Sequence, residues 1–227
     1  MHNSLTSAGP TAAVVLAGGR STRMGLPKHL LKLPDGCPLY KFHFELIQEA
    51  CPTISRIYIS LASDSHMDEE LRNTVCNPHI TSAAGLEFGV LWDEESPLDD
   101  QKEVKESGGP AKGLLAAWRL RPRETWLVVA CDYPRLTADA IQYLFTVYVP
   151  PVTYFRNSAY FSEPLISIWS PQALERLARN VEAGMGGPSR TIKELGGTML
   201  DVPTGEDWLY NVNRKEDWDK VFVNHKV

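Results

Sequence analysis

The sequence predicts an α/β protein in which a doubly wound, mostly parallel sheet lies between two helical layers, a Rossmann-like α/β/α arrangement. Strand-like and helix-like segments alternate throughout residues 12–148, the order that builds parallel sheets. The first and fourth strand-like segments, AAVVLA and WLVVA, are continuous apolar runs, which are typical of strands buried on both faces. The length of 227 residues suits one domain of this kind.

Each expected element has a local signal in the sequence. Apolar residues recur at helical spacing before Pro52, which ends the first helix. Thr137 is a suitable N-cap, Pro171 suits a first helical turn, and Ser189 could cap a short surface helix. The expected strands are 12–17, 56–61, 86–92, 126–130, 152–155, 165–169 and 198–202, and the expected helices are 39–50, 65–76, 109–119, 137–148, 171–181 and 215–223.

The chain is predicted to form a single domain over residues 11–227, after a flexible tail at 1–10. Neither an internal repeat nor a low-complexity linker divides it. No charged and apolar leader and no long apolar run is present, so we expect neither a signal peptide nor a membrane span. The four cysteines show no CxxC spacing and the six histidines no HExxH spacing. These observations favour a reduced, cytoplasmic setting.

Charge is unevenly distributed along the chain. Lys plus Arg number 23 and Asp plus Glu 28, a net charge of −5 that argues against a nucleic-acid-binding surface. Residues 1–34 contain no acid but carry Arg20, Arg23, Lys28 and Lys32, so the remainder holds 19 bases against 28 acids. The sequence therefore places a basic loop in an otherwise acidic chain.

That basic loop follows the first strand directly. Gly18, Gly19 and Gly25 permit backbone conformations that direct several N–H groups inward, and Arg23 and Lys28 could bind phosphate oxygens. In a doubly wound sheet, ligands bind at the carboxyl ends of strands. Neither a Walker A loop nor the dinucleotide GxGxxG pattern fits these residues. The alternative is a glycine-rich turn with solvated basic side chains.

The loop also carries a family resemblance. LAGGRSTRMGLPKHLL, residues 16–31, resembles the signature LAGGxSxRMGxxKxLL of the MobA-like nucleotidyltransferases. Four further segments resemble family motifs in the same order: GPAKGL (109–114) is similar to GPLAGL, ACDYP (130–134) to xCDxP, EPL (163–165) to xPL, and NVNRKED (211–217) to NxNxxED. The matches span residues 12–218, nearly the whole chain.

The resemblance implies a Mg²⁺-dependent nucleotidyltransferase that joins an NTP to a phosphorylated acceptor and releases pyrophosphate. It implies Arg23, Lys28 and Asp132 as catalytic residues, and Asp132 with Asn213, or its neighbour Asn211, as metal ligands. The nucleotide-binding residues that it implies are Leu16, Ala17, Gly18, Gly19, Arg23, Lys28, Asp93 and Asp132. Without the resemblance, Asp132 could be a helix cap and the two asparagines ordinary turn residues.

The LAGG sequence resembles the molybdenum cofactor guanylyltransferases, which implies GTP as the nucleotide and molybdopterin as the acceptor. The nucleotide site is expected mainly within 12–134 and the acceptor site mainly within 109–217. A cytidylyltransferase, a sugar-phosphate nucleotidyltransferase and a non-catalytic nucleotide-binding protein are the alternatives.

Three departures from the family pattern leave alternatives open. The family often has an asparagine after the second strand, where this chain offers only Ser60 or Ser63, so either serine replaces it or base recognition differs. Lys112 could reach the acceptor phosphate or face solvent, and Ser189 with Arg190 could bind the same phosphate. The acidic segment 93–106 is expected to be mostly a surface loop.

Overall fold

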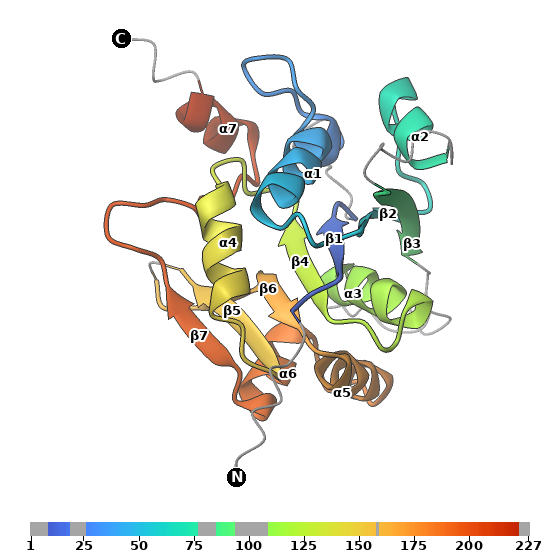
Figure 1. Cartoon of the computed structure of the whole chain (residues 1–227). Coiled ribbons are helices and arrows are strands. Elements are labelled where there is room, and N and C mark those ends of the chain that lie inside the picture. Colours follow the sequence, from blue (N-terminus) through green and yellow to red (C-terminus); the bar gives the residue numbers. More distant parts are fainter. Residues whose placement is uncertain (1–8, 19–25, 77–84, 94–108, 158, 223–227) are drawn as a thin grey trace.

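A computed structural model describes residues 9–18, 26–76, 85–93, 109–157 and 159–222. One sheet of seven strands, in the order β3-β2-β1-β4-β6-β5-β7, forms the centre of the molecule (Figure 1). The strands are β1 (Ala12–Leu16), β2 (Arg56–Ala62), β3 (Glu87–Asp93), β4 (Trp126–Ala130), β5 (Val152–Arg156), β6 (Ser162–Trp169) and β7 (Thr198–Asp201). The helices are η1 (Lys28–Leu30, 3₁₀), α1 (Leu39–Ala50), α2 (Glu69–Cys76), α3 (Gly109–Leu120), α4 (Ala138–Thr146), α5 (Pro171–Glu182), α6 (Pro188–Leu195) and α7 (Lys215–Phe222).

Strand direction defines two edges of this sheet. β1 pairs in parallel with β2 and β4, β2 with β3, and β5 with β7, whereas β6 is antiparallel to both β4 and β5. Six strands therefore end at the same edge, which we call the carboxyl edge, and begin at the opposite amino edge. The predicted, mostly parallel α/β sheet is confirmed, and its one reversed strand is β6.

Helices cover both faces of the sheet (Figure 1). Side chains of α1, α2 and α4 pack with Ala13 and Val15 of β1, and those of α3, α5 and α6 pack with Val14 on the other face. Every residue of β1 is buried, as its apolar sequence predicts. Full burial of one such valine contributes roughly 1.5–3 kcal/mol, so the central strand is held from both sides.

Helix starts follow local chemistry, with two corrections. The Thr137 side chain accepts a hydrogen bond from the Ala140 N–H at 3.2 Å, which confirms the predicted cap of α4. The prediction of Ser189 as a cap is wrong: α6 begins at Pro188 with Gly187 in the N-cap position, because proline suits the first helical position. α2 begins at Glu69 rather than at 65, because Asp68 accepts the Leu71 N–H at 2.7 Å as an N-cap does.

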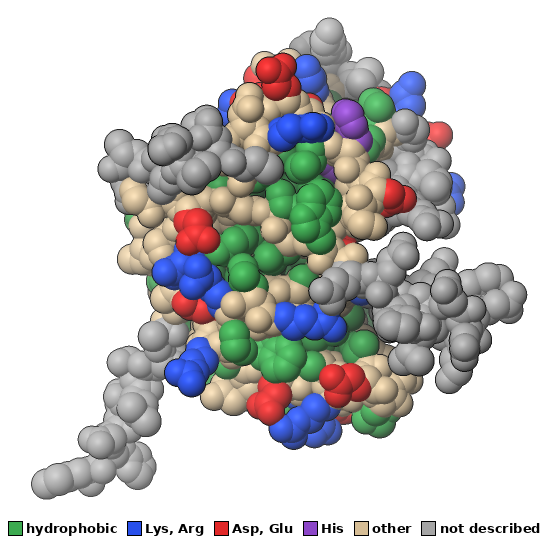
Figure 2. Space-filling view, turned by 90° about the vertical axis from the view of Figure 1, so that its right-hand side faces the viewer, with side chains coloured by type: hydrophobic (Ala, Val, Ile, Leu, Met, Phe, Trp, Pro, Cys, Tyr) green, Lys and Arg blue, Asp and Glu red, His purple; other side chains and the backbone are tan. Residues whose placement is uncertain are grey.

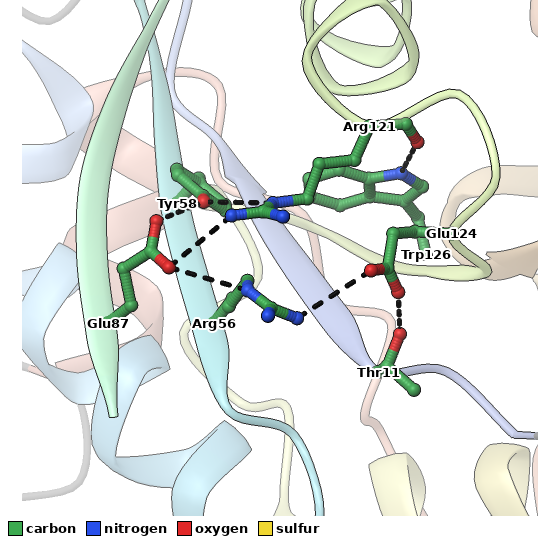
Figure 3. Close-up of polar contacts among 7 residues, drawn as sticks. All are labelled: Thr11, Arg56, Tyr58, Glu87, Arg121, Glu124 and Trp126. Carbon is green, nitrogen blue, oxygen red and sulfur yellow. Dashed lines mark hydrogen bonds and ion pairs between the residues drawn. The ribbon is translucent and has the colours of Figure 1, made fainter. Parts of the chain in front are cut away.

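Charged side chains tie together the starts of four strands at the amino edge (Figure 3). Glu87 accepts a hydrogen bond from the Tyr58 hydroxyl and lies 3.4 Å from both Arg56 Nε and an Arg121 terminal nitrogen. The other end of Arg56 lies 3.6 Å from Glu124, which accepts a hydrogen bond from Thr11. We call these six residues the amino-edge network: Thr11, Arg56, Tyr58, Glu87, Arg121 and Glu124. Its two arginines and two glutamates carry no net charge.

The surface on the side of α2, β3 and α3 has a mixed character. Acidic and basic side chains are scattered there among hydrophobic and neutral ones (Figure 2). Such interspersed charges are typical of the surface of a globular domain. Within the described ranges, no helix is both long and apolar enough to span a bilayer.

Candidate active site

Three segments bring polar side chains together at the carboxyl edge. Lys28 Nζ lies 2.9 Å from Asp132 Oδ2 and 2.8 Å from Asn213 Oδ1. Lys28 begins η1, Asp132 follows β4, and Asn213 precedes α7. The Val212 N–H donates to the Asp132 carbonyl at 2.9 Å, which attaches the last of these segments to the end of β4. We call Lys28, Asp132 and Asn213 the lysine cluster.

Sheet pairing fixes the position of Asp132. The Cys131 N–H donates to the Leu16 carbonyl at 3.0 Å, so the pairing of β4 with β1 continues one residue beyond the strand. Asp132 is then the first residue to leave the sheet. The side chains of Lys28 and Asp132 are each 19% exposed, which leaves the pair accessible to a ligand.

A buried histidine supports the same turn. His43 of α1 is fully buried and its Nε2 lies 3.1 Å from the Cys131 carbonyl oxygen. Burial lowers the pKa of His43 to about 4, so the ring is neutral at pH 7 and carries its proton on Nε2. Sequence reasoning missed this residue, because its partner lies 88 positions away.

A second group of polar residues lies at the ends of β2 and β3. The Ser60 hydroxyl donates to Asp93 Oδ1, and both residues are buried. A Cβ atom at Gly18 would overlap Asp93 Oδ2, and one at Gly113 of α3 would lie 2.6 Å from Ser60 Oγ. Both glycines are therefore required by close packing. We call Ser60 and Asp93 the serine–aspartate pair.

Electrostatics at Asp93 are those of a partly desolvated carboxylate. Burial raises the pKa of Asp93, opposed by the hydrogen bond from Ser60 and then by the positive charge of Lys112. Lys112, which is partly exposed, therefore lies close enough to Asp93 for its charge to act on that carboxylate. Ser63, the other serine in question, is exposed, and it is Ser60 that contacts Asp93.

The first strand connects the two groups. Leu16 accepts the hydrogen bond from Cys131 beside Asp132, and the Ala17 N–H donates to the Ser60 carbonyl at 2.9 Å. Gly18 contacts Asp93. Of the residues implied by the resemblance, these three and Lys28, Asp93, Asp132 and Asn213 thus lie at one edge of the sheet. Gly19 and Arg23 lie outside the described residues.

The two asparagines near α7 have different neighbours. Asn213 contacts Lys28, whereas the Asn211 side chain interacts with the Tyr133 hydroxyl and its Oδ1 is buried without a hydrogen-bond partner in the described part of the chain. Of the two asparagines, it is thus Asn213 that contacts Lys28.

The oxygen atoms of the lysine cluster suit a magnesium ion. Asp132 and Asn213 both direct an oxygen at one ammonium group, so the space between them already accommodates a cation. A carboxylate and an amide are oxygen ligands of the kind that Mg²⁺ takes beside substrate phosphates and water. Within the described ranges, no group of three His, Cys, Asp or Glu forms a complete protein site. Asp132 and Asn213 can therefore supply two of the oxygen ligands of such an ion.

A cavity of about 600 Å³ opens at the carboxyl ends of β5 and β7. Its walls include Arg156, Tyr160 and the segment 201–207. Arg156 pairs with Asp201 and lies 4.8 Å from the centre of the Tyr160 ring. We call this space the β5–β7 cavity.

The β5–β7 cavity adjoins the turn that carries Asp132. Arg135, three residues after Asp132, forms an ion pair with Asp207 and lies 5.2 Å from the centre of the Tyr210 ring. Asp207 and Tyr210 both line the cavity, and Tyr210 precedes Asn213 by three residues. One edge of the sheet thus carries the lysine cluster with this cavity next to it.

The open α/β sheet, with a glycine-containing loop, a lysine and carboxylates at its carboxyl edge, defines the class of nucleotide-binding α/β proteins. Residues 13–198 match the MobA-like NTP transferase domain, and the chain belongs to that family of nucleotidyltransferases.

Proteins with related sequences are named for molybdenum cofactor synthesis. A probable molybdenum cofactor guanylyltransferase from Rhodopirellula baltica is 26% identical over 220 residues, which cover 94% of this chain and 92% of the relative. A molybdenum cofactor biosynthesis bifunctional protein from Synechocystis is 23% identical over 93% of this chain. The match spans only 54% of that longer protein.

A solved structure shows the same fold. The molybdopterin-guanine dinucleotide biosynthesis protein A of Archaeoglobus fulgidus superimposes with a TM-score of 0.62. The superposition covers 94% of this chain and 97% of that one, at 18% sequence identity.

Proposed function

We propose that this nucleotidyltransferase transfers the guanylyl group of GTP to the terminal phosphate of molybdopterin. The observation that carries the proposal is the lysine cluster, in which Lys28 Nζ lies within 3 Å of oxygens of both Asp132 and Asn213. The related guanylyltransferase from Rhodopirellula baltica supports GTP and a molybdenum cofactor precursor as the substrate pair.

The reaction needs positioning and charge stabilisation more than covalent help from the protein. An oxygen of the acceptor phosphate attacks the α-phosphorus of GTP, a new P–O–P bond forms, the bond to the β-phosphate breaks, and pyrophosphate leaves. The attacking phosphate is already an anion, so no general base is required. The enzyme lowers the barrier by aligning the reactants and by stabilising negative charge.

Lys28 is proposed to exchange its partner when the nucleotide binds. Its ammonium turns from Asp132 towards the phosphate oxygens and stabilises the departing pyrophosphate. Asp132 and Asn213 then become available as ligands of Mg²⁺, which when bound neutralises phosphate charge and makes the α-phosphorus more electrophilic. Arg23 is proposed to act on the same phosphates from the preceding loop.

The serine–aspartate pair is proposed to contact the nucleoside. The Asp93 carboxylate accepts a hydrogen bond from the neutral Ser60 hydroxyl. Its remaining acceptor positions suit the N–H groups on the Watson–Crick edge of guanine. Ser60 is proposed to take the place of the asparagine of other family members by orienting Asp93.

The β5–β7 cavity is proposed to receive the acceptor. It lies at the same edge as the lysine cluster, and Arg135 contacts two of its lining residues from the turn that carries Asp132. A ligand in this cavity can therefore direct a phosphate towards the lysine cluster.

Nucleotide and acceptor choice can be tested in one experiment. Thermal unfolding is measured with GTP, CTP, UTP or ATP and Mg²⁺, and pyrophosphate release is then measured with molybdopterin or a sugar 1-phosphate. We expect stabilisation by GTP, about 2.7 kcal/mol at 100 times its Kd, and release only with GTP and molybdopterin. Selective stabilisation by CTP, release with a sugar phosphate, or binding without turnover would overturn the proposal.

A further inference from the structure

A hydrogen-bonded chain joins the turn that carries Asp132 to the β5–β7 cavity. Tyr133, which is 2% exposed, donates its hydroxyl to Glu163 Oε2 at 2.7 Å. The other oxygen of Glu163 accepts the Asn157 side-chain N–H, also at 2.7 Å. Tyr133 follows Asp132 directly, and Asn157 lines the cavity. One carboxylate thus connects the end of β4 with the end of β5.

Asn157 in turn shapes the connection between β5 and β6. Its side-chain oxygen accepts the N–H groups of Ala159 at 3.0 Å and Phe161 at 3.1 Å. Both ends of this amide are therefore committed: the oxygen to the turn, and the nitrogen to Glu163. Glu163 therefore fixes the orientation of the Asn157 amide, and backbone hydrogen bonds between Asn157 and both Tyr160 and Phe161 complete the turn.

The turn holds Tyr160 in an uncommon conformation. Tyr160 has φ 64°, in the left-handed region that non-glycine residues rarely adopt, and its side chain is 74% exposed at the cavity. Such a conformation persists only where surrounding contacts impose it. The contacts here are the hydrogen bond from the Tyr160 N–H to the Asn157 carbonyl and the Arg156 guanidinium over the Tyr160 ring. The Asn157 side chain is in turn held by Glu163.

We infer that Glu163 is a positioning residue for the acceptor, holding the turn that carries Asn157 and Tyr160 at a fixed place relative to Asp132. The inference rests on the proposed use of the β5–β7 cavity for the acceptor. Both donors to Glu163 are neutral, and the two hydrogen bonds satisfy one oxygen each. The carboxylate therefore bridges two segments of the chain. Among the described residues, its hydrogen bonds go to Tyr133 and Asn157 and not to the lysine cluster.

The test replaces Glu163 and separates acceptor kinetics from nucleotide binding. In Glu163→Ala we expect kcat with molybdopterin to fall about 10- to 100-fold, as is usual when a supporting residue is lost, while the Kd for Mg²⁺–GTP stays within twofold. Glu163→Gln can still accept a hydrogen bond from Asn157 through its oxygen and donate one to the Tyr133 hydroxyl oxygen through its nitrogen. We therefore expect it to retain at least a third of kcat.

Tyr58→Phe provides a control, because it breaks another hydrogen bond between a tyrosine and a glutamate, but at the amino edge. It is expected to leave both kinetic constants within twofold. Hydrogen exchange of the Phe161 amide gives a readout independent of activity. We expect exchange to rise at least tenfold in Glu163→Ala and to remain unchanged in Tyr58→Phe.

Three results would overturn the positioning role: unchanged exchange in Glu163→Ala, unchanged kcat in that variant, or an equal loss in the Gln and Ala variants. A wild-type enzyme that releases no pyrophosphate from GTP with molybdopterin contradicts the proposed function instead. In that case faster exchange at Phe161 still supports the bridge, and unchanged exchange overturns it, so the two failures are distinguishable.

Discussion

At the amino edge of the sheet two arginines face two glutamates, whereas at the carboxyl edge one lysine faces a carboxylate and an amide. The amino-edge network joins the starts of β1 to β4 with Arg121, which follows α3, and its charges balance (Figure 3). The lysine cluster joins segments that lie outside the sheet. A buried carboxylate, Asp93, lies at the same edge and is held by a neutral hydroxyl.

This difference shows which edge is organised for a ligand. Balanced, half-exposed ion pairs contribute little stability and need no further partner. Desolvation of a carboxylate costs stability, and carboxylates whose pKa is shifted by burial are typical of functional sites. The amino edge is therefore interpreted as structural and the carboxyl edge as functional, and each of the following predictions tests that division.

The largest effect is expected at Lys28. Lys28→Ala removes the cation proposed to stabilise the departing pyrophosphate, and kcat should fall about 10²- to 10³-fold, the usual range for loss of one such group. Arg56→Ala is the matched cation at the amino edge, and it should leave kcat within twofold. Steady-state pyrophosphate release measures both variants. An equal loss in the two would contradict the division.

The next effect concerns His43 and the pH dependence of stability. Its folded-state pKa of about 4 lies below the ordinary histidine pKa of 6.5, so between these values the unfolded chain binds more protons. The free energy of unfolding should therefore fall as pH decreases through this window, by roughly 3 kcal/mol in total from His43.

Urea unfolding at several pH values tests this expectation. His43→Leu should flatten the decline, though not remove it, because burial also lowers the pKa of His29. Leu46→Ala, which removes another buried side chain of α1 but no titratable group, serves as a control and should retain the wild-type slope. A wild-type slope in His43→Leu would contradict the prediction.

A smaller effect is expected from removing one hydroxyl at either edge. Ser60→Ala leaves the buried Asp93 without its donor, which should cost about 1–3 kcal/mol of unfolding free energy and also weaken GTP binding. Tyr58→Phe should cost less, because Glu87 is half-exposed and keeps its arginine partners. Urea unfolding measures the stability of each variant, and GTP titration measures its affinity for the nucleotide. An equal loss of GTP affinity in Ser60→Ala and Tyr58→Phe would contradict the account.

The smallest effect is expected at Glu87. Glu87→Gln keeps the shape of the side chain and removes one charge of the amino-edge network, so the cost should stay below about 1 kcal/mol. Because exposed ion pairs are screened, the difference from wild type should shrink further in 1 M NaCl. A cost of several kcal/mol, independent of salt, would show that this edge contains more than a surface network.

The fold was largely predictable because its signals are local. The continuous apolar runs at β1 and β4 predicted buried strands, and Thr137 predicted the start of α4, since each signal lies within a few residues of its effect. The direction of β6 could not be predicted in this way, because it is set by pairing with β4 and β5. Ser189 was mistaken for a cap because the neighbouring Pro188 has the stronger local preference.

The site was predictable only where a motif carries it. Lys28 and Asp132 belong to distinct motifs, and the structure brings them together. The supporting residues follow no local pattern: His43 meets Cys131 over 88 positions, and Glu163 meets Tyr133 over 30. Contacts over such separations depend on the packing of the whole sheet.

One pair of substitutions tests the central claim most directly. Asp132→Asn and Glu87→Gln make the same chemical change, from carboxylate to amide, at the two edges of one sheet. Mg²⁺-dependent release of pyrophosphate from GTP with molybdopterin should fall about 10³-fold in the first and stay within twofold of wild type in the second. Full activity in Asp132→Asn, or equal losses in both variants, would contradict the assignment of the carboxyl edge as the active site.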